Sequence, residues 1–244
     1  MRVTAIIQAR MGSTRLPGKV LKNIKGKTVL SHVIERVKQA ESVDEIIIAT
    51  SDKQQDEPIM EEALSNDVKI FRGSEKDVLS RYYLAAKENR AETIIRITSD
   101  CPVIDPKVID EIVNFYEESE HDIVTNAGSE PDTRTYPRGL DTEVFSFRAL
   151  ENSYMNAKEH YQREHVTPYI YENANSVYYY KGKKDLSHFR WTLDTIEDFR
   201  LINEIYNYLY QGKHNFYLNE IINLFKEHPE LYEINQHIEQ KKIK

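Results

Sequence analysis

Short apolar runs of strand length alternate with amphipathic stretches of helix length through the first half of the chain. The run IIIAT, at residues 46–50, is apolar on both faces, which is typical of a strand covered by helices on each side. Alternation of this kind predicts an α/β fold, built from successive strand–helix–strand units on a mostly parallel sheet. The predicted strands are 3–8, 45–49, 68–71, 93–98 and 122–125, and the predicted helices are 29–39, 55–64, 78–87 and 106–116.

The second half of the chain departs from this regular alternation. Residues 128–139 read GSEPDTRTYPRG, and these turn-forming residues predict a long loop or insertion. The part beyond the loop is expected to be more mixed than parallel, and we expect a single domain over residues 1–244, since no clear linker divides the chain. The predicted strands here are 142–147, 176–181 and 188–193, and the predicted helices are 148–156, 163–172 and those from 196 onward.

The loop QARMGSTRLPGK, which follows the first strand, is the first candidate for a ligand site, because parallel sheets bind ligands beyond the carboxyl ends of their strands. Gly12 and Gly18 allow a ligand to approach the backbone closely. Arg10, Arg15 and Lys19 bring three cations to the same small space. The loop therefore predicts a cradle for phosphates, the alternative being that these side chains only solvate an exposed loop.

Two common phosphate-binding motifs do not describe this loop. A P-loop is excluded because five residues, rather than four, separate Gly12 from Gly18. In addition, Val20 stands where a P-loop has the Ser or Thr that binds magnesium. No GxGxxG motif follows the strand, so a dinucleotide-binding fold has no specific support either.

The distribution of charge separates the start of the chain from the remainder. The chain carries 33 basic and 40 acidic residues, for a net charge of −7. Residues 1–34 contain seven basic and no acidic residues, which leaves 26 basic and 40 acidic residues elsewhere. A local positive focus in an acidic chain suits a small polyanion better than a long duplex, so we expect no nucleic-acid partner.

The sequence has few features that indicate the compartment of the protein or its association with a membrane. Cys101 is the single cysteine, so neither an internal disulfide nor a cysteine cluster for a metal can form. The chain runs from Met1 directly into a strand-like segment, and no run approaches about 18 continuous apolar residues. We therefore expect a cytoplasmic protein that does not span a membrane.

The N-terminal loop resembles the A-R-x-x-S-x-R-L-P-G-K signature of the cytidylyltransferase family that activates acidic sugars, including CMP-KDO and CMP-sialic acid synthetases. The resemblance is closest to the subgroup known as spore coat polysaccharide biosynthesis protein F. It extends over most of the chain through GSEKDVLSRY, TSDCPVID, RGLDTEVFS, REHVTPYI and RWTLDTIEDF. The residues that match the signature are Ala9, Arg10, Ser13, Arg15, Leu16, Pro17, Gly18 and Lys19.

The resemblance implies a nucleotidyltransferase domain with a Rossmann-like, mostly parallel sheet of the nucleotide-diphospho-sugar transferase (GT-A-like) type. It implies transfer of a nucleotide, CMP from CTP, to a sugar or sugar acid with release of pyrophosphate, in cell-surface or spore-coat polysaccharide biosynthesis. It also suggests a homodimer. The residues expected to bind the nucleotide in the loop are Ala9, Arg10, Gly12, Ser13, Arg15 and Lys19, of which Arg10 and Lys19 are expected to act in catalysis.

Two aspartates at predicted strand ends are candidates for holding Mg²⁺, which nucleotidyl transfer commonly requires. Asp100 follows TIIRITS, and its alternative role is to form the turn before Pro102. Asp194 follows FRWTL, and together with Glu197 it could instead cap the next helix. The family places an aspartate of a matching DTxED segment beside the first aspartate at magnesium, so Asp100 and Asp194 are the expected metal ligands and catalytic residues.

Arg72 and Asp77, in FRGSEKDVLSRY, follow the third predicted strand and are expected to reach the base or ribose of the nucleotide. Their alternative role is to form a surface turn and the start of a helix.

Four further residues are weaker candidates for binding the sugar. Asp141 and Glu143 fall on one face of a predicted strand by period-two alternation, where they could receive a sugar or a cation or simply be solvated. Arg163 and His165, in REHV, could meet an acidic sugar, although a lone histidine is more often structural.

Two other functions remain open at this point. A glycosyltransferase acting on an existing nucleotide sugar would be expected to carry a DxD metal motif, which this sequence lacks. A catalytically silent nucleotide-binding protein of polysaccharide assembly would bind nucleotide without releasing pyrophosphate.

Overall fold

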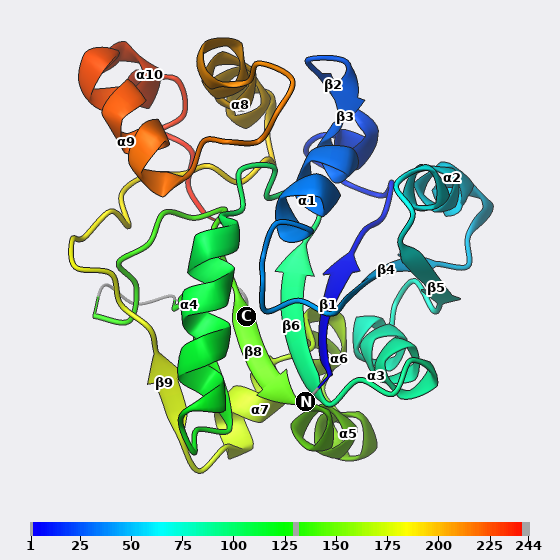
Figure 1. The fold of residues 1–244 in the computed structure, drawn as a ribbon. Coiled ribbons are helices and arrows are strands. Elements are labelled where there is room, and N and C mark those ends of the chain that lie inside the picture. Colours follow the sequence, from blue (N-terminus) through cyan, green and yellow to red (C-terminus); the bar gives the residue numbers. More distant parts are fainter. Residues whose placement is uncertain (1, 129–131, 241–244) are drawn as a thin grey trace.

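One sheet forms the centre of the protein in the computed structural model, whose described residues are 2–128 and 132–240 (Figure 1). Its strands are β1 (Val3–Gln8), β4 (Glu45–Ser51), β5 (Lys69–Gly73), β6 (Thr93–Thr98), β7 (Ile123–Thr125), β8 (Glu143–Ser146) and β9 (Val177–Tyr179). The seven strands lie in the order β5-β4-β1-β6-β8-β7-β9. Strand β8 runs antiparallel to β6 and to β7, and every other neighbouring pair is parallel. The predicted mostly parallel sheet with a mixed C-terminal part is therefore confirmed.

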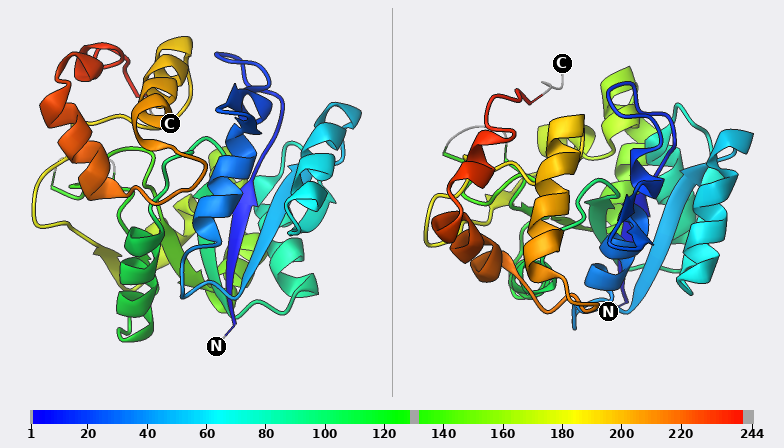
Figure 2. Two further views of the ribbon diagram at one scale, coloured as in Figure 1. Left: turned by 45° about the horizontal axis from the view of Figure 1, so that its top comes forward. Right: turned by 90° about the horizontal axis from the view of Figure 1, so that it is seen from above.

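Helices cover both faces of this sheet. The first face carries α1 (Val29–Val37), α2 (Glu57–Ser65), α4 (Pro106–Glu117), α8 (Ile196–Leu209), α9 (Leu218–Glu227) and α10 (Glu230–Glu233). The second face carries α3 (Val78–Glu88), α5 (Phe147–Asn156), α6 (His160–His165) and α7 (Pro168–Asn173). Figure 2 shows α8, α9 and α10 gathered on one side of the molecule. No helix in the described part of the chain is long and apolar enough to cross a membrane.

Strand β1 supplies side chains to both hydrophobic cores. Ala5 and Ile7 pack in the core of the first face, and Ile6 packs in the core of the second, as the alternation of side chains along a strand requires. Gln8, at the end of β1, lies level with Ala49 of β4 and Thr98 of β6. The arrowheads of β1 and β6 point to the same edge in Figure 1, so the segments that follow these strands meet there.

A short hairpin and a 3₁₀ turn follow the first loop. The turn is η1 (Lys19–Leu21), and the hairpin consists of β2 (Asn23–Ile24) and β3 (Lys27–Thr28). Another 3₁₀ turn, η2 (Gln54–Asp56), precedes α2, where the sequence predicted the first residues of a helix.

The predicted strand at residues 188–193 is wrong. This segment forms only a single parallel bridge, between Arg138 and Arg190, rather than a ladder. Trp191 and Leu193 are nevertheless completely buried in the core of the first face. Their alternating burial resembles that of a strand, although the segment forms one isolated β-bridge and no ladder within the described residues.

The predicted helix at residues 163–172 is divided into α6 and α7. Val166 has a φ of 72°, outside the helical range, and ends α6. Pro168 begins α7, where its missing N–H costs nothing because the first N–H groups of a helix have no partner within that helix.

The loop predicted at residues 128–139 lies partly outside the described residues, since 129–131 are not among them. Its last residue, Gly139, has a φ of 103° and packs directly against the chain that leads to Asp194. A Cβ atom there would lie 2.6 Å from the carbonyl carbon of Trp191 and 2.7 Å from the nitrogen of Thr192. Only glycine satisfies both the backbone angle and this close approach.

Replacing Gly139 by Ala should lower the free energy of unfolding by about 3 kcal/mol, because backbone strain and a backbone clash act together. The matched control is Gly212→Ala, where φ is 86° and nothing lies within 4 Å of the added methyl group. It should cost only about 1 kcal/mol. Urea unfolding followed by circular dichroism measures both values, and equal losses would contradict the close packing at Gly139.

Candidate active site

The ammonium group of Lys19 lies between two carboxylates from distant parts of the chain. Lys19 Nζ is 2.6 Å from Asp100 Oδ2 and 2.8 Å from Asp194 Oδ1. The side chain of Lys19 is only 12% exposed, so this contact is largely shielded from solvent. The structure thus brings together the basic loop and both aspartates that the sequence singled out.

Backbone geometry holds these three residues at the carboxyl edge of the sheet. Asp100 follows β6 by two residues, and its carbonyl oxygen accepts a hydrogen bond from Leu193 N at 2.8 Å. That bond fixes the segment before Asp194 beside the end of β6. Gly18, with a left-handed φ of 65°, turns the chain into η1 so that Lys19 faces this edge.

Asp56 stabilises the loop after β1 through a hydrogen bond to its backbone. This buried carboxylate accepts a hydrogen bond from Met11 N at 2.7 Å and another from the hydroxyl of Ser51. Within the loop, Gly18 N donates to Met11 O at 3.1 Å and Leu16 N donates to Ser13 Oγ at 3.3 Å. The loop is therefore preorganised by its own contacts, and Asp56 is a supporting residue that the sequence did not reveal.

Neighbouring charges control the protonation of the central pair. Burial opposes the charged form of Lys19, but Asp100 and Asp194 offset it and raise the pKa of Lys19 above 10.5. Burial likewise opposes ionisation of Asp100, but Lys19 and the hydroxyl of Thr98 lower the pKa of Asp100 below 3.8. Both groups are therefore charged at neutral pH.

Asp194 also contacts two arginines through its other oxygen, Oδ2. Arg15 Nη2 is 3.0 Å from this oxygen and Arg190 Nη2 is 2.9 Å from it. Arg190 is itself held by the fully buried Asp198, at 2.9 Å. Arg190 lies four residues before Asp194, but no pattern in the sequence indicates its contact with that carboxylate.

The helix after Asp194 is capped by other residues, which leaves the Asp194 carboxylate available. Thr195 is the N-cap of α8 and forms a capping box with Asp198. The predicted alternative, in which Asp194 and Glu197 cap this helix, is therefore wrong. Asp198 Oδ2 accepts hydrogen bonds from the backbone N–H groups of Asp194 and Thr195, each at 2.9 Å.

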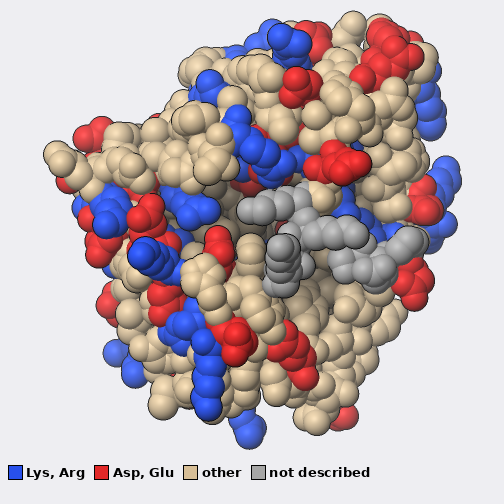
Figure 3. Space-filling view, turned by 180° about the vertical axis from the view of Figure 1, so that it is seen from behind, with Lys and Arg blue, Asp and Glu red and all other residues tan. Residues whose placement is uncertain are grey.

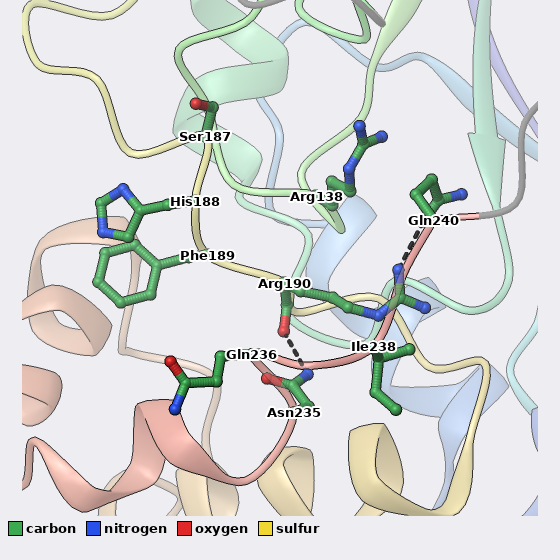
Figure 4. A pocket seen from close by; sticks show the side chains of 9 residues that line it. All are labelled: Arg138, Ser187, His188, Phe189, Arg190, Asn235, Gln236, Ile238 and Gln240. Carbon is green, nitrogen blue, oxygen red and sulfur yellow. Dashed lines mark hydrogen bonds between the residues drawn. The ribbon is translucent and has the colours of Figure 1, made fainter.

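Arg190 links the site to a small pocket of about 100 Å³ (Figure 4). Its Nη1 donates to Gln240 Oε1 at 2.5 Å, and its carbonyl oxygen accepts from Asn235 at 2.8 Å. Arg138 lines the same pocket and points away from Arg190 in this view. The last described residues of the chain therefore support the arginine that contacts Asp194.

The positive charge of the first 34 residues is largely paired in the folded protein. Arg2 lies 2.8 Å from Glu45, and Lys27 pairs with Glu35, in addition to the contacts of Arg15 and Lys19. Basic and acidic side chains are interspersed over the face seen in Figure 3. Arg10 is exposed and forms no ion pair with residues 2–128 or 132–240, so its charge remains available to a ligand.

Two further loop candidates, Ala9 and Gly12, differ in their exposure. Ala9 is buried and its N–H donates to Ala49 O at 3.2 Å. Gly12 is exposed, and a Cβ there would lie 3.6 Å from Gln55 Nε2. The exposed backbone at Gly12 is thus open to a phosphate group.

Arg72 and Asp77, predicted to reach the nucleotide, both have partners in the protein. Arg72 donates to the carbonyl oxygens of Ser51 at 3.1 Å and Lys53 at 3.2 Å. Asp77 caps α3 and forms an ion pair of 2.6 Å with Arg163. Arg163, predicted to bind a sugar, therefore forms an ion pair with Asp77.

The other weak sugar candidates do not share one strand face. Asp141 precedes β8 and pairs with Arg134, whereas Glu143 begins β8 and pairs with Arg96. The prediction that both lie on one strand is therefore wrong. Glu143 is only 3% exposed and also accepts hydrogen bonds from the hydroxyl groups of Thr167 and Tyr171.

His165 is the last residue of α6 and is partly buried.

The two central carboxylates are oxygen ligands of the kind that a hard divalent cation prefers. Asp100 and Asp194 present oxygen ligands that already converge on one positive charge, that of Lys19. Mg²⁺ is usually held by one or two carboxylates together with phosphate oxygens and water. In the described part of the chain, no group of three His, Cys, Asp or Glu side chains could hold a metal ion.

Comparison with known proteins places the chain in a family. Residues 4–243 match the family model described as cytidylyltransferase. The chain is 41% identical to an uncharacterized protein of Methanocaldococcus jannaschii over 249 residues, which cover 99% of this chain and 97% of that protein. It is 35% identical to the spore coat polysaccharide biosynthesis protein SpsF of Bacillus subtilis over 213 residues, or 82% and 85% of the two chains.

A solved cytidylyltransferase structure from Leptospira borgpetersenii has a TM-score of 0.88 and 34% identity, covering 99% of this chain and 100% of that one. The chain therefore belongs to the cytidylyltransferase family and is an enzyme of that type. The predicted family and the predicted nucleotidyltransferase type of fold are confirmed.

Replacing Lys19 by Met should lower the free energy of unfolding at neutral pH by about 2 kcal/mol, because two carboxylates are left facing each other. Lys19 holds the pKa of Asp100 below 3.8, so its contribution is present above pH 3.8 and is lost as pH falls through the lowered pKa. The difference between wild type and Lys19→Met should therefore shrink below about pH 4.

Denaturant unfolding at several pH values measures this difference. The control is Lys25→Met, since Lys25 is an exposed lysine in the turn between β2 and β3. It should leave stability nearly unchanged at every pH. A Lys19→Met deficit that stays constant from neutral to acidic pH would contradict the assigned ion pairs.

Proposed function

We propose that this enzyme transfers CMP from CTP to a hydroxyl group of a sugar or sugar acid and releases pyrophosphate. The observation that carries the proposal is the contact of Lys19 with both Asp100 and Asp194 at the carboxyl edge of the sheet. A phosphate-binding cation and two metal-binding carboxylates are the groups that nucleotidyl transfer requires, and here they meet at one point.

In this proposal the triphosphate binds along the loop after β1. The exposed Gly12 lets phosphate oxygens approach the backbone, and Arg10 provides a cation that forms no ion pair with the described residues. Arg15 provides another cation, and its Nη2 atom lies 3.0 Å from Asp194 Oδ2. Three cations around a flexible polyanion neutralise charge and limit its motion, which together account for much of the catalysis of phosphoryl-type transfer.

Lys19 exchanges its partners when substrate binds. Phosphate oxygens replace the carboxylates of Asp100 and Asp194 as the acceptors for its ammonium group, so its positive charge remains compensated. Asp100 and Asp194 would then hold Mg²⁺. Bound there, Mg²⁺ would neutralise charge that develops on the α-phosphate and the departing pyrophosphate.

The transfer itself needs no nucleophile from the protein. The sugar hydroxyl oxygen forms a new bond to the α-phosphorus, and the bond between that phosphorus and the bridging oxygen to the β-phosphate breaks. Pyrophosphate leaves with the electron pair, and the hydroxyl proton passes to solvent. Arg10, Arg15 and Lys19 stabilise the negative charge on the phosphates through this change.

A role in polysaccharide biosynthesis is supported by the name of the related protein from Bacillus subtilis. The alignment with that relative covers 82% of this chain at 35% identity. A sugar of a cell-surface or spore-coat polysaccharide is therefore the proposed acceptor class.

The proposal is tested by incubating the enzyme with CTP, Mg²⁺ and a panel of neutral sugars and sugar acids, and measuring pyrophosphate. Release that depends on one acceptor, with formation of a CMP-sugar seen by mass spectrometry, is the expected result. Release of the nucleoside diphosphate from a nucleotide sugar would indicate a glycosyltransferase instead. Nucleotide binding without any release under all conditions would indicate a catalytically silent protein.

Asp100→Asn and Asp194→Asn should each reduce kcat by about 10²-fold or more, because neutral amides hold Mg²⁺ poorly. The matched control is Asp185→Asn, since Asp185 is exposed and accepts a hydrogen bond from the nearby Ser187 N at 2.9 Å. It should retain wild-type kcat. Circular dichroism checks that all three variants fold, and wild-type turnover by Asp100→Asn would exclude the proposed metal site.

A further inference from the structure

The two carboxylates proposed to hold Mg²⁺ are occupied by a cation of the protein itself. Lys19 Nζ lies 2.6 Å from Asp100 Oδ2 and 2.8 Å from Asp194 Oδ1, the distances of charge-assisted hydrogen bonds. The contact uses one oxygen of each carboxylate and draws both toward the same point. A metal ion held by these two residues would need the same pair of carboxylates, so the ammonium group and the ion compete for them.

The other oxygen of each carboxylate is engaged as well. Asp100 Oδ1 accepts a hydrogen bond from the hydroxyl of Thr98 at 2.6 Å. Asp194 Oδ2 lies 2.9 Å from Arg190 Nη2 and 3.0 Å from Arg15 Nη2. All the carboxylate oxygens of the pair therefore already have a donor or a cation beside them.

The charges of this group of side chains balance among themselves. The group consists of three cations and three anions joined by ion pairs: Lys19, Arg15, Arg190, Asp100, Asp194 and Asp198. A divalent cation added to it would meet no net negative charge and would enter beside an ammonium group of the same sign. The side chains of Lys19 and Asp194 are only 12% and 14% exposed, so solvent screens this repulsion little.

Lys19 can change its partners by moving its side chain alone. Its backbone is fixed on both sides, since Lys19 N donates to Leu16 O and Lys19 O accepts from Lys22 N, each at 3.2 Å. A lysine carries a compact charge with rotatable donors on a flexible stem of four carbons. Its ammonium group can therefore turn from the carboxylates to phosphate oxygens bound along the same loop.

We propose that Lys19 substitutes for the divalent cation before nucleotide binds, and that it keeps Asp100 and Asp194 closed to metal until phosphate oxygens draw its ammonium group away. This inference rests on the proposed function, in which the triphosphate lies along the loop after β1. The triphosphate supplies the negative charge that Lys19 gives up and frees both carboxylates together. Metal and nucleotide then bind with positive coupling, each raising the affinity of the enzyme for the other.

Such coupling gives Lys19 two roles besides its contact with phosphate. Its charge compensates the repulsion between the carboxylates of Asp100 and Asp194 while no nucleotide is bound. It also prevents a divalent cation from entering the site ahead of the nucleotide. Lys19 thereby sets the order in which the site is filled.

The test measures binding of Mn²⁺ without nucleotide, by electron paramagnetic resonance, which distinguishes free from protein-bound Mn²⁺. Lys19→Gln removes the charge and keeps a hydrogen-bond donor. This variant should bind Mn²⁺ about tenfold or more tightly than the wild-type enzyme does. Lys19→Met should behave in the same way, so the result does not depend on the added amide.

Two controls locate the ion. Lys25→Gln removes the charge of an exposed lysine in the turn between β2 and β3, and it should bind Mn²⁺ as weakly as the wild-type enzyme. Lys19→Gln combined with Asp100→Asn should lose the binding gained by Lys19→Gln alone. Gained binding that survives the loss of Asp100 would place the ion elsewhere and overturn the inference.

Denaturant unfolding gives a second readout that does not involve turnover. Without divalent cations, Lys19→Gln should be less stable than wild type at neutral pH, because two carboxylates are left facing each other. MgCl₂ should restore part of this loss, since an ion that binds only the folded protein stabilises it. NaCl at the same ionic strength should restore less, because it only screens the repulsion.

Two results would overturn the inference. The first is Mn²⁺ affinity of the wild-type enzyme, without nucleotide, within about twofold of that of Lys19→Gln. The second is recovery of the stability of Lys19→Gln to the same extent in MgCl₂ and in NaCl.

The failures of the two proposals differ. Pyrophosphate release by a wild-type enzyme that also binds Mn²⁺ tightly without nucleotide would retain the proposed function and overturn the role of Lys19. Absence of pyrophosphate release, with Mn²⁺ binding gained only in the Lys19 variants, would overturn the proposed function and still support control of the two carboxylates by Lys19.

Discussion

The contact of one lysine with two aspartates connects parts of the chain that are far apart in sequence. Lys19 follows the first strand, Asp100 follows β6 and Asp194 precedes α8. Because the group is largely buried, its attraction is little screened by water, but each charge also loses hydration. Additional donors offset that loss: the hydroxyl of Thr98 contacts Asp100, and Arg190 contacts Asp194.

The support around this contact keeps it in place without using the groups that a substrate needs. Asp56 holds the backbone of the loop after β1, and Asp198 holds both Arg190 and the backbone at Asp194. The side chain of Arg10 stays exposed. Hydrogen bonds to Asp56 and Asp198 thus supply rigidity, while the exposed side chain of Arg10 remains for a ligand. Preorganisation of this kind lowers the free energy that a bound nucleotide must provide to order the site.

Sequence patterns were most informative for candidate residues that directly follow a buried strand. Asp100 was recognised because it follows a buried strand, and the structure places it at the expected edge. The strand pattern did not predict the ion pair of Glu143, because its partner Arg96 lies on a neighbouring strand. Asp77 and Arg163 were assigned separately to nucleotide and sugar, although they form an ion pair across 86 residues. Contacts between side chains distant in sequence leave no periodic signal.

The sequence by itself determined most of the strands and helices along the chain, the position of the basic loop after β1 and the family to which the chain belongs. Periodicity and turn-forming residues act locally, so these features can be read along the chain. Only the tertiary structure decided which charged groups meet. It paired Lys19 with two aspartates, engaged Arg72 with backbone carbonyls and, among the described residues, left Nε and Nη1 of Arg81 without a hydrogen-bond partner. Burial and pairing depend on neighbours brought together by folding, and these alone determine whether a charge is structural or available to a ligand.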